Sequence, residues 1–82
     1  MAEILYFGRL TDATGTPGET ISLPASVQDT NALRHWLDAE KALDGALLER
    51  TVRIAINSEI VGDTHPVRDS DEIALMPPVG GG

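Results

Sequence analysis

Near the start of the chain, residues 3–7 form a largely apolar, β-rich run in which Ile4 and Tyr6 point to one side and Leu5 and Phe7 to the other. A period of two is typical of a β-strand, and apolar residues on both sides predict a strand that is partly covered on each face. Gly8 ends this strand. After a loop rich in glycine and proline, residues 20–23 alternate again and stop at Pro24, which predicts a second strand that pairs back on the first.

A helix is predicted between this hairpin and the second half of the chain. Ser26, followed by Asp29 three residues later, resembles a capping box, so we place the helix over residues 27–37. Apolar residues recur there at helical spacing, which indicates that one side of the helix packs on the sheet. The apolar stripe consists of Leu33, Trp36 and Leu37, with Trp36 as the expected core anchor, and Arg34, His35 and Asp38 flank it.

The second half returns to a strand-like pattern. Strands are predicted over residues 52–56, 60–61 and 72–76, with turns at 57–58 and 69–71, and a weaker helical turn is predicted around 43–49. This order defines an α+β protein in which one mixed sheet wraps around one main helix. The crossover after the first hairpin lets the last strand pair in parallel with the first, so both are expected near the middle of the sheet, as in the β-grasp arrangement.

The last six residues differ from everything before them. Two consecutive prolines donate no backbone hydrogen bond, so they end the sheet after Met76 and project the chain as a stiff spacer. The glycines that follow have no Cβ, so the walls of another protein could close on them. We therefore divide the chain into a domain over residues 1–76 and a flexible tail over residues 77–82, which reaches roughly 20 Å when extended. The tail consists of Pro77, Pro78, Val79, Gly80, Gly81 and Gly82.

The terminal carboxylate of Gly82 is the candidate reactive group. Its unperturbed pKa is about 3.3 to 3.7, so it is an anion at neutral pH and a poor acyl donor until an outside enzyme activates it. A second interpretation stays open, because chain ends of small residues are often frayed and a terminal glycine run can be a cloning remnant. Against it, the glycines follow the last strand closely and lack the serines and charges of a linker.

Composition limits the possible functions. With 82 residues the chain is one domain, too small for a catalytic cleft between lobes, so it is not expected to be an enzyme on its own. A net charge of −7 argues against nucleic acid and favours a basic protein partner. The absence of cysteine means that any sulfur chemistry must use sulfur from elsewhere. No stretch is long enough for a membrane span and the start lacks the basic residues of a signal peptide, so we expect a cytoplasmic protein.

The tail carries a family resemblance. Together with residues 69–76 and the run 52–57, it resembles the small subunits of molybdopterin synthase, which are ubiquitin-like sulfur carriers. The resemblance covers essentially the whole chain, including Phe7 and the predicted helix, but only the C-terminal stretch is specific. This chain departs from the family pattern at Ser58 and Ser70, where glycine is common, at Gly80, where Ala or Ser is common, and at Thr11, near a usual basic residue.

The resemblance implies a role as co-substrate, with no catalytic residue and no bound cofactor or metal in this chain. A ubiquitin-activating-type adenylating enzyme would use ATP and Mg²⁺ to convert the Gly82 carboxylate to an acyl adenylate. Sulfur from a persulfide donor would then give a Gly82 thiocarboxylate. The tail would enter the large synthase subunit, where the sulfur would attack the cyclic pterin monophosphate precursor.

A tail that enters a partner protein must be accompanied by binding of the domain to that partner, because ordering each backbone residue of the tail costs about 1 to 2 kcal/mol. Phe7, Met76 and Val79 are the candidates for a docking face, since an aromatic ring, a flexible thioether and a branched side chain near the tail would form an apolar patch. The alternative is that Phe7 and Met76 are ordinary core residues.

The remaining polar residues point to simpler roles. His35 and His65 are far apart in sequence and have no carboxylate at metal-ligand spacing, so neither is expected to bind metal or to be catalytic. The acidic cluster of Asp69, Asp71 and Glu72 lacks the pattern of a calcium loop, and we interpret it as turn residues whose charge could meet basic groups on the activating enzyme.

Another carrier function, a modifier function and a structural role remain open from the sequence. The chain could carry sulfur for thiazole or cysteine synthesis, although the proline pair favours the molybdopterin pathway. It could also be a ubiquitin-like modifier that shares the activation step and delivers Gly82 to a lysine amine. A small interaction domain with an idle tail is the third possibility, and it would tolerate loss of Gly82.

Overall fold

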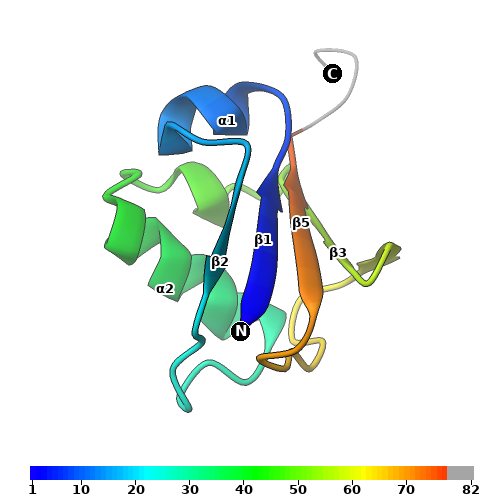
Figure 1. Cartoon of the computed structure of the whole chain (residues 1–82). Coiled ribbons are helices and arrows are strands. Elements are labelled where there is room, and N and C mark those ends of the chain that lie inside the picture. Colours follow the sequence, from blue (N-terminus) through cyan, green and yellow to red (C-terminus); the bar gives the residue numbers. More distant parts are fainter. Residues whose placement is uncertain (78–82) are drawn as a thin grey trace.

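The computed structural model describes residues 1–77 of the chain. Within this range a five-stranded sheet is combined with two α-helices and one 3₁₀ turn (Figure 1). The elements in chain order are β1 (Ala2–Tyr6), α1 (Arg9–Thr14), β2 (Gly18–Ile21), α2 (Thr30–Lys41), η1 (Ala46–Leu48), β3 (Arg53–Ile56), β4 (Glu59–Val61) and β5 (Glu72–Met76).

The strands lie in the order β2-β1-β5-β3-β4, so the first and last strands of the chain are neighbours inside the sheet. They pair in parallel, with Ile4 beside Ile73 and Tyr6 beside Leu75, as the sequence predicted. The β1–β2, β3–β4 and β3–β5 pairs are antiparallel. A hairpin, a crossing helix and further strands around a parallel central pair make this the β-grasp fold.

The core lies between one face of the sheet and α2, which crosses that face (Figure 1). Alternate strand residues point into it, and the helix contributes Leu33 and Leu37, both fully buried. Among the helices of residues 1–77, none has the length and apolar character needed to cross a membrane. The sheet contributes Ala2, Ile4, Tyr6, Ile54, Ile56, Ile73 and Leu75 to the buried cluster.

Helix α2 begins three residues later than predicted and has a different cap. Asp29 is the N-cap, and its Oδ1 accepts a hydrogen bond from the Ala32 amide at 2.8 Å, so the predicted capping box with Ser26 is wrong. Trp36 packs against the core but is only partly buried, so it is not the anchor we predicted. Arg34 and Asp38, predicted to flank the apolar stripe, are buried.

The segment between the first two strands holds a short helix that the sequence analysis treated as a loop. Helix α1 buries Leu10 and ends at Gly15, whose backbone is left-handed at φ 79° and whose amide donates to the Thr11 carbonyl. Strand β2 therefore starts at Gly18, two residues before the predicted strand, and ends at Ile21. The weak helical turn predicted around 43–49 is present as η1, which follows Gly45 at φ 89°.

Candidate functional site

The site predicted from the sequence lies at the end of β5. Met76 is the last residue of that strand, and Pro77 follows it as the last residue that the structure describes. The predicted reactive residue Gly82 and four of the predicted threading residues lie outside the described residues. These four are Pro78, Val79, Gly80 and Gly81, so Val79 as a docking residue also stays a prediction.

Gly8 lies against the start of the tail. Its backbone has φ 56° and ψ −137°, a conformation that a residue with a side chain rarely adopts. A Cβ at this position would lie 2.8 Å from Cγ of Pro77, which is closer than carbon atoms approach without strain. The neighbouring amide of Phe7 donates to the Leu75 carbonyl at 3.1 Å and ties this turn to β5. The absence of a side chain at Gly8 therefore lets the chain leave the sheet along its present path.

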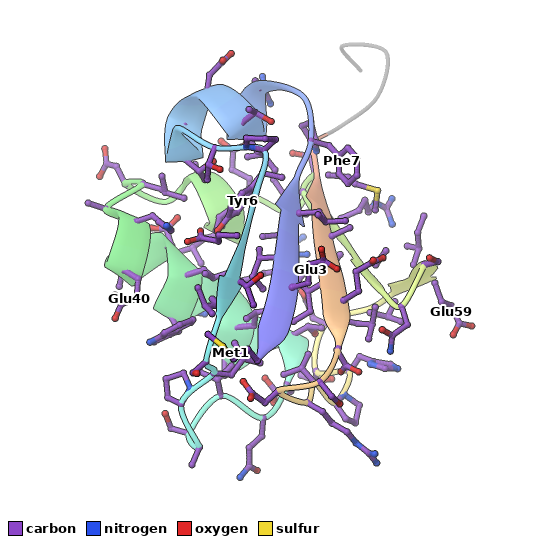
Figure 2. All side chains as sticks on the ribbon, in the orientation of Figure 1. Met1, Glu3, Tyr6, Phe7, Glu40 and Glu59 are labelled. Atoms are coloured by element: carbon purple, nitrogen blue, oxygen red, sulfur yellow. The ribbon has the colours of Figure 1, made fainter. Side chains whose placement is uncertain are left out.

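Phe7 lies on the side of the sheet that faces away from α2. Ile4 and Tyr6 point into the core, so Leu5 and Phe7 point to the other face by the alternation of the strand. The Phe7 side chain lies beside the end of β5 (Figure 2) and is 47% exposed. The interpretation of Phe7 as an ordinary core residue is therefore wrong, while its docking role stays a prediction. Met76, on the same face, is partly buried.

Further apolar residues extend this surface across the sheet. The strand registers place Leu5 beside Ala74, Ala74 beside Ala55, and Ala55 beside Ile60. Ile60, in the edge strand β4, is 62% exposed. We call this surface the open face and define it by Leu5, Phe7, Ala55, Ile60, Ala74 and Met76.

Leu5 and Ile60 are not among the site residues predicted from the sequence. The alternation in residues 3–7 did place Leu5 on the side of Phe7. Ile60, however, lies in a three-residue strand, which is too short for alternation to show which face it joins. Only the register with Ala55 places it on the open face.

Charges are distributed unevenly along the sheet. Arg53 pairs in register with Met76, and Arg9 directly follows Gly8, so two cations lie at the end of the molecule where the tail begins. Asp69 and Asp71 precede β5 and lie at the opposite end. An acidic protein therefore has basic groups beside its candidate site.

Asp69 and Asp71 act as turn residues, as the sequence predicted. Oδ1 of Asp69 accepts from the Leu23 amide at 2.7 Å, and Oδ2 lies 3.1 Å from the Met1 amine. The hydrogen bond from the Leu23 amide, followed by the one from the Met1 amine, holds the pKa of the Asp69 carboxyl below its usual value. Asp71 accepts hydrogen bonds from the Arg68 amide and from Asn57.

The two histidines are exposed, and each ring contacts a nearby backbone carbonyl: His35 that of Asn31 and His65 that of Pro66. Within residues 1–77, His, Asp and Glu side chains form no group of three or more that could hold a metal ion. A pocket of about 220 Å³ lies between α1 and η1, with Arg9 and Glu49 among its lining residues.

A polar chain joins β1, β2 and α2 on the other side of the sheet. The Tyr6 hydroxyl donates to Glu19 Oε2 at 2.8 Å, and Lys41 Nζ donates to Glu19 Oε1 at 2.7 Å. Burial alone would raise the pKa of Glu19, but the hydrogen bonds from Lys41 and Tyr6 and the charge of Lys41 outweigh it and lower that pKa. Burial, the hydrogen bond to Glu19 and the charge of Glu19 raise the pKa of the Tyr6 hydroxyl well above its usual value.

A five-stranded mixed sheet with its first and last strands paired in parallel, covered on one face by α2, is the architecture of the ubiquitin-like β-grasp proteins. The chain belongs to the ThiS family, whose profile matches residues 4–82. The molybdopterin synthase sulfur carrier subunit of Homo sapiens is 38% identical over 84 residues, covering 98% of this chain and 92% of the relative. The protein of the same name from Escherichia coli (strain K12) is 33% identical over 85 residues and the match covers 100% of both chains.

Solved structures agree with this assignment. The small archaeal modifier protein 1 from Methanosarcina acetivorans superposes with a TM-score of 0.76 at 28% identity, covering 99% of this chain and 95% of that chain. The complex of subunits 1 and 2 of the molybdopterin-converting factor from Helicobacter pylori 26695 contains a chain that matches with a TM-score of 0.66 at 28% identity, covering 99% and 97%. The predicted family and fold are therefore confirmed.

Proposed function

We propose that this chain is the sulfur-carrier subunit of a molybdopterin synthase and acts in molybdenum cofactor biosynthesis. The observation that carries the proposal is similarity over the full length to relatives of that name, 38% and 33% identical, with Gly81 and Gly82 inside the family match. The β-grasp domain supports the proposal because its last strand leads straight into the tail.

In the proposed reaction the chain supplies its own C-terminal carboxylate. An adenylating enzyme of the ubiquitin-activating type uses ATP and Mg²⁺ to form an acyl adenylate on Gly82, with pyrophosphate released. The outer sulfur of a persulfide donor attacks the acyl carbon, a C–S bond forms, and AMP leaves with the electrons of the broken C–O bond. A thiol, acting as the two-electron reductant, then attacks the donor's sulfur in the remaining S–S bond, which releases the Gly82 thiocarboxylate and leaves a disulfide on the donor. The thiocarboxylate then transfers its sulfur to the cyclic pterin monophosphate precursor, and the Gly82 carboxylate is regenerated.

The catalytic groups belong to the partner in this proposal, and this chain is a co-substrate. The large synthase subunit would bind the open face and receive the tail. Phe7, Met76 and Ile60 offer apolar area for docking, and Val79 would join them from the tail. Docking would offset the entropy lost when the tail is ordered. The cytoplasmic location and the absence of a bound cofactor remain predictions from the sequence.

A mass measurement tests the proposal. The full chain is incubated with its adenylating enzyme, ATP, Mg²⁺ and a sulfide source, and the intact mass is determined. We expect the shift of one oxygen-to-sulfur exchange, and its reversal when the large subunit and the pterin precursor are added. A chain lacking Gly82 is the control and should show no shift. If the intact chain also fails to change mass, every carrier and modifier function is excluded together.

Attachment to proteins is the second candidate function, because the Methanosarcina acetivorans structure at 28% identity is that of a modifier protein. Activation would be the same, but the acyl group of Gly82 would pass to an amine. Family membership alone also leaves open a sulfur carrier for thiazole or cysteine synthesis. The same incubation separates these functions, because only the molybdopterin carrier is desulfurated by the large subunit with the pterin precursor, and only the modifier forms amide-linked adducts.

A further inference from the structure

Lys41 is the only lysine in the 82-residue sequence. It is the last residue of α2, and its ammonium group donates to Glu19 Oε1 at 2.7 Å. The Lys41 side chain is 28% exposed and that of Glu19 is 21% exposed, so most of the pair is covered by the protein. The single side-chain amine of this sequence is therefore held in a partly buried ion pair.

The acceptor of this pair is itself held in place. The Tyr6 hydroxyl donates to the second oxygen of the Glu19 carboxylate at 2.8 Å, and Tyr6 is 2% exposed. Tyr6 belongs to β1, Glu19 to β2 and Lys41 to α2, so three elements hold the three groups together. A carboxylate with both oxygens bonded is less free to move away from Lys41 than one on an exposed side chain.

A free lysine is a chemical hazard for a protein that carries an activated acyl group. The lysine nitrogen would attack the carbonyl carbon of the Gly82 adenylate, and a C–N bond would form while the C–O bond to phosphate breaks. AMP would leave with the bonding electrons, and the nitrogen would release one proton to solvent. The product would be an amide-linked dimer of the carrier, in which the copy that supplied the acyl group no longer has a free terminus to accept sulfur.

Docking at the open face would not remove this hazard. Helix α2 covers the opposite face of the sheet (Figure 1), and Glu40, the neighbour of Lys41, points away from the sheet on the helix side (Figure 2). A partner bound to Phe7 and Ile60 would therefore leave the helix side uncovered. In such a complex, protection of Lys41 would come from the domain itself.

We infer that the Tyr6–Glu19–Lys41 chain shields the only lysine from acylation and so keeps the activated carrier from conjugating to itself through Lys41. The shield acts before any chemistry, because the ammonium must leave Glu19 and lose a proton before its lone pair can attack. The benefit of the shield rests on the proposed activation of Gly82, but the low reactivity of Lys41 does not and is tested separately.

The direct test acetylates the full-length chain with a small N-hydroxysuccinimide ester and follows Lys41 by mass spectrometry of the tryptic peptide 35–50. Glu19→Gln keeps the size of the side chain and removes the charge, and Glu40→Gln is the matched control on the exposed side of α2. We expect Lys41 to react about three- to tenfold faster in E19Q than in the wild type, and unchanged in E40Q. The 59% exposed Met1 supplies an internal reference amine whose rate should not change.

Tyr6→Phe keeps the ring in the core and removes only the donor to Glu19, so it should raise the rate by a smaller factor. If E19Q does not fold, the rate of Lys41 acetylation in Tyr6→Phe tests the inference in its place. If Lys41 is acetylated at the same rate in the wild type and in the folded variants, the inference that Lys41 is shielded is wrong.

The second arm uses the adenylating enzyme with ATP and Mg²⁺ in the absence of sulfide. The wild type should form no dimer linked through Lys41, E19Q should accumulate that dimer, and Lys41→Arg in the E19Q background should abolish it. Equal dimer in the wild type and in E19Q would contradict the inference. If no adenylation occurs at all, the proposed function fails, while the acetylation arm still decides whether Lys41 is shielded.

Discussion

Gly8 shows how much one residue without a side chain contributes to the candidate site. Two independent features require glycine there: a backbone at φ 56° and the approach of Pro77, whose Cγ would lie 2.8 Å from any Cβ. In the sequence, Gly8 indicates only the end of a strand. Its role beside the tail depends on the parallel pairing of β1 and β5, which brings residues almost 70 positions apart into contact.

We predict that Gly8→Ala destabilises the domain by about 1 to 2 kcal/mol, because alanine at positive φ is strained and Pro77 must move. Gly62→Ala is the matched control. Gly62 does not have a positive φ, and a Cβ added there would meet nothing within 4 Å, so this change should be nearly neutral. Urea unfolding of both variants measures the difference, and equal stabilities would show that Gly8 is not required for this path of the chain.

The helical pattern predicts the wrong environment for two charged residues, Arg34 and Asp38, which are buried. Arg34 and Asp38 flank an apolar stripe, and charged residues in that position usually lie in solvent. Their burial depends on backbone groups outside the helix: Asp38 accepts from the amides of Gly45 and Leu47, and Arg34 donates to the Val52 carbonyl at 2.6 Å. A periodicity within one helix contains no information about such distant partners.

At the scale of elements, Arg34 fastens α2 to the segment that leads into β3. Its guanidinium also donates to the carbonyls of Leu47 and Glu49 and pairs with Asp63 at 3.0 Å. One planar group with several donors can reach all of these acceptors, whereas an ammonium cannot. Arg34 therefore adds several polar contacts to the core packing that joins α2 to the rest of the domain.

We predict that Arg34→Lys lowers the free energy of unfolding by about 1 to 3 kcal/mol, because buried carbonyls lose their donors. Arg50→Lys, at an exposed arginine in the same segment, is the control and should change stability by less than about 0.5 kcal/mol. Thermal unfolding of the two variants compares them. An Arg34→Lys variant as stable as the wild type would mean that solvent replaces these hydrogen bonds.

The strands and the main helix could be predicted because their apolar residues repeat with a clear period. Helix α1 could not, since six residues give less than two turns and Leu10 is its one buried residue. The turn at 57–58 was located correctly, but its geometry was not evident. Asn57 and Ser58 both have positive φ, at 51° and 72°, so Ser58 occupies a position that favours glycine in this hairpin.

At the scale of the whole molecule, the Tyr6–Glu19–Lys41 chain makes the free energy of unfolding depend on pH in both acid and alkaline solution. The pKa of Glu19 is lower in the folded protein than its ordinary value of 4.5, so its stabilisation is present above that pH and is lost as the pH falls below it. The pKa of Tyr6 is higher than its ordinary value of 10.0, so its contribution is lost as the pH rises above 10.0 and the unfolded chain ionises.

We predict that E19Q flattens the acid side of the stability curve, measured as unfolding free energy against pH. Asp69, whose pKa is also lowered, should leave a residual slope. Tyr6 is the only tyrosine in the sequence, so phenolate absorbance reports on it alone. In the folded wild type this absorbance should appear only at a pH well above 10.0, and at a lower pH in E19Q. An ordinary tyrosine titration in the folded protein would contradict the buried hydrogen bond.

The open face allows binding to be separated from folding, because its outermost residue contributes little to the core. Ile60 is 62% exposed, so Ile60→Thr keeps a β-branched side chain in β4 and should change stability by less than about 1 kcal/mol. Burying the isoleucine against a partner contributes about 1.5 to 3 kcal/mol, so the variant should bind the large synthase subunit at least about tenfold more weakly by calorimetry.

Leu48→Thr is the control for this last prediction, since Leu48 is 42% exposed but lies in η1, away from the open face. Loss of apolar area there should leave the affinity unchanged. Because the tail is intact in both variants, a difference between them assigns the docking energy to the body of the protein. Equal affinities would mean that the tail alone, or another surface, holds the complex together, and the open face would no longer explain how the ordering of the tail is offset.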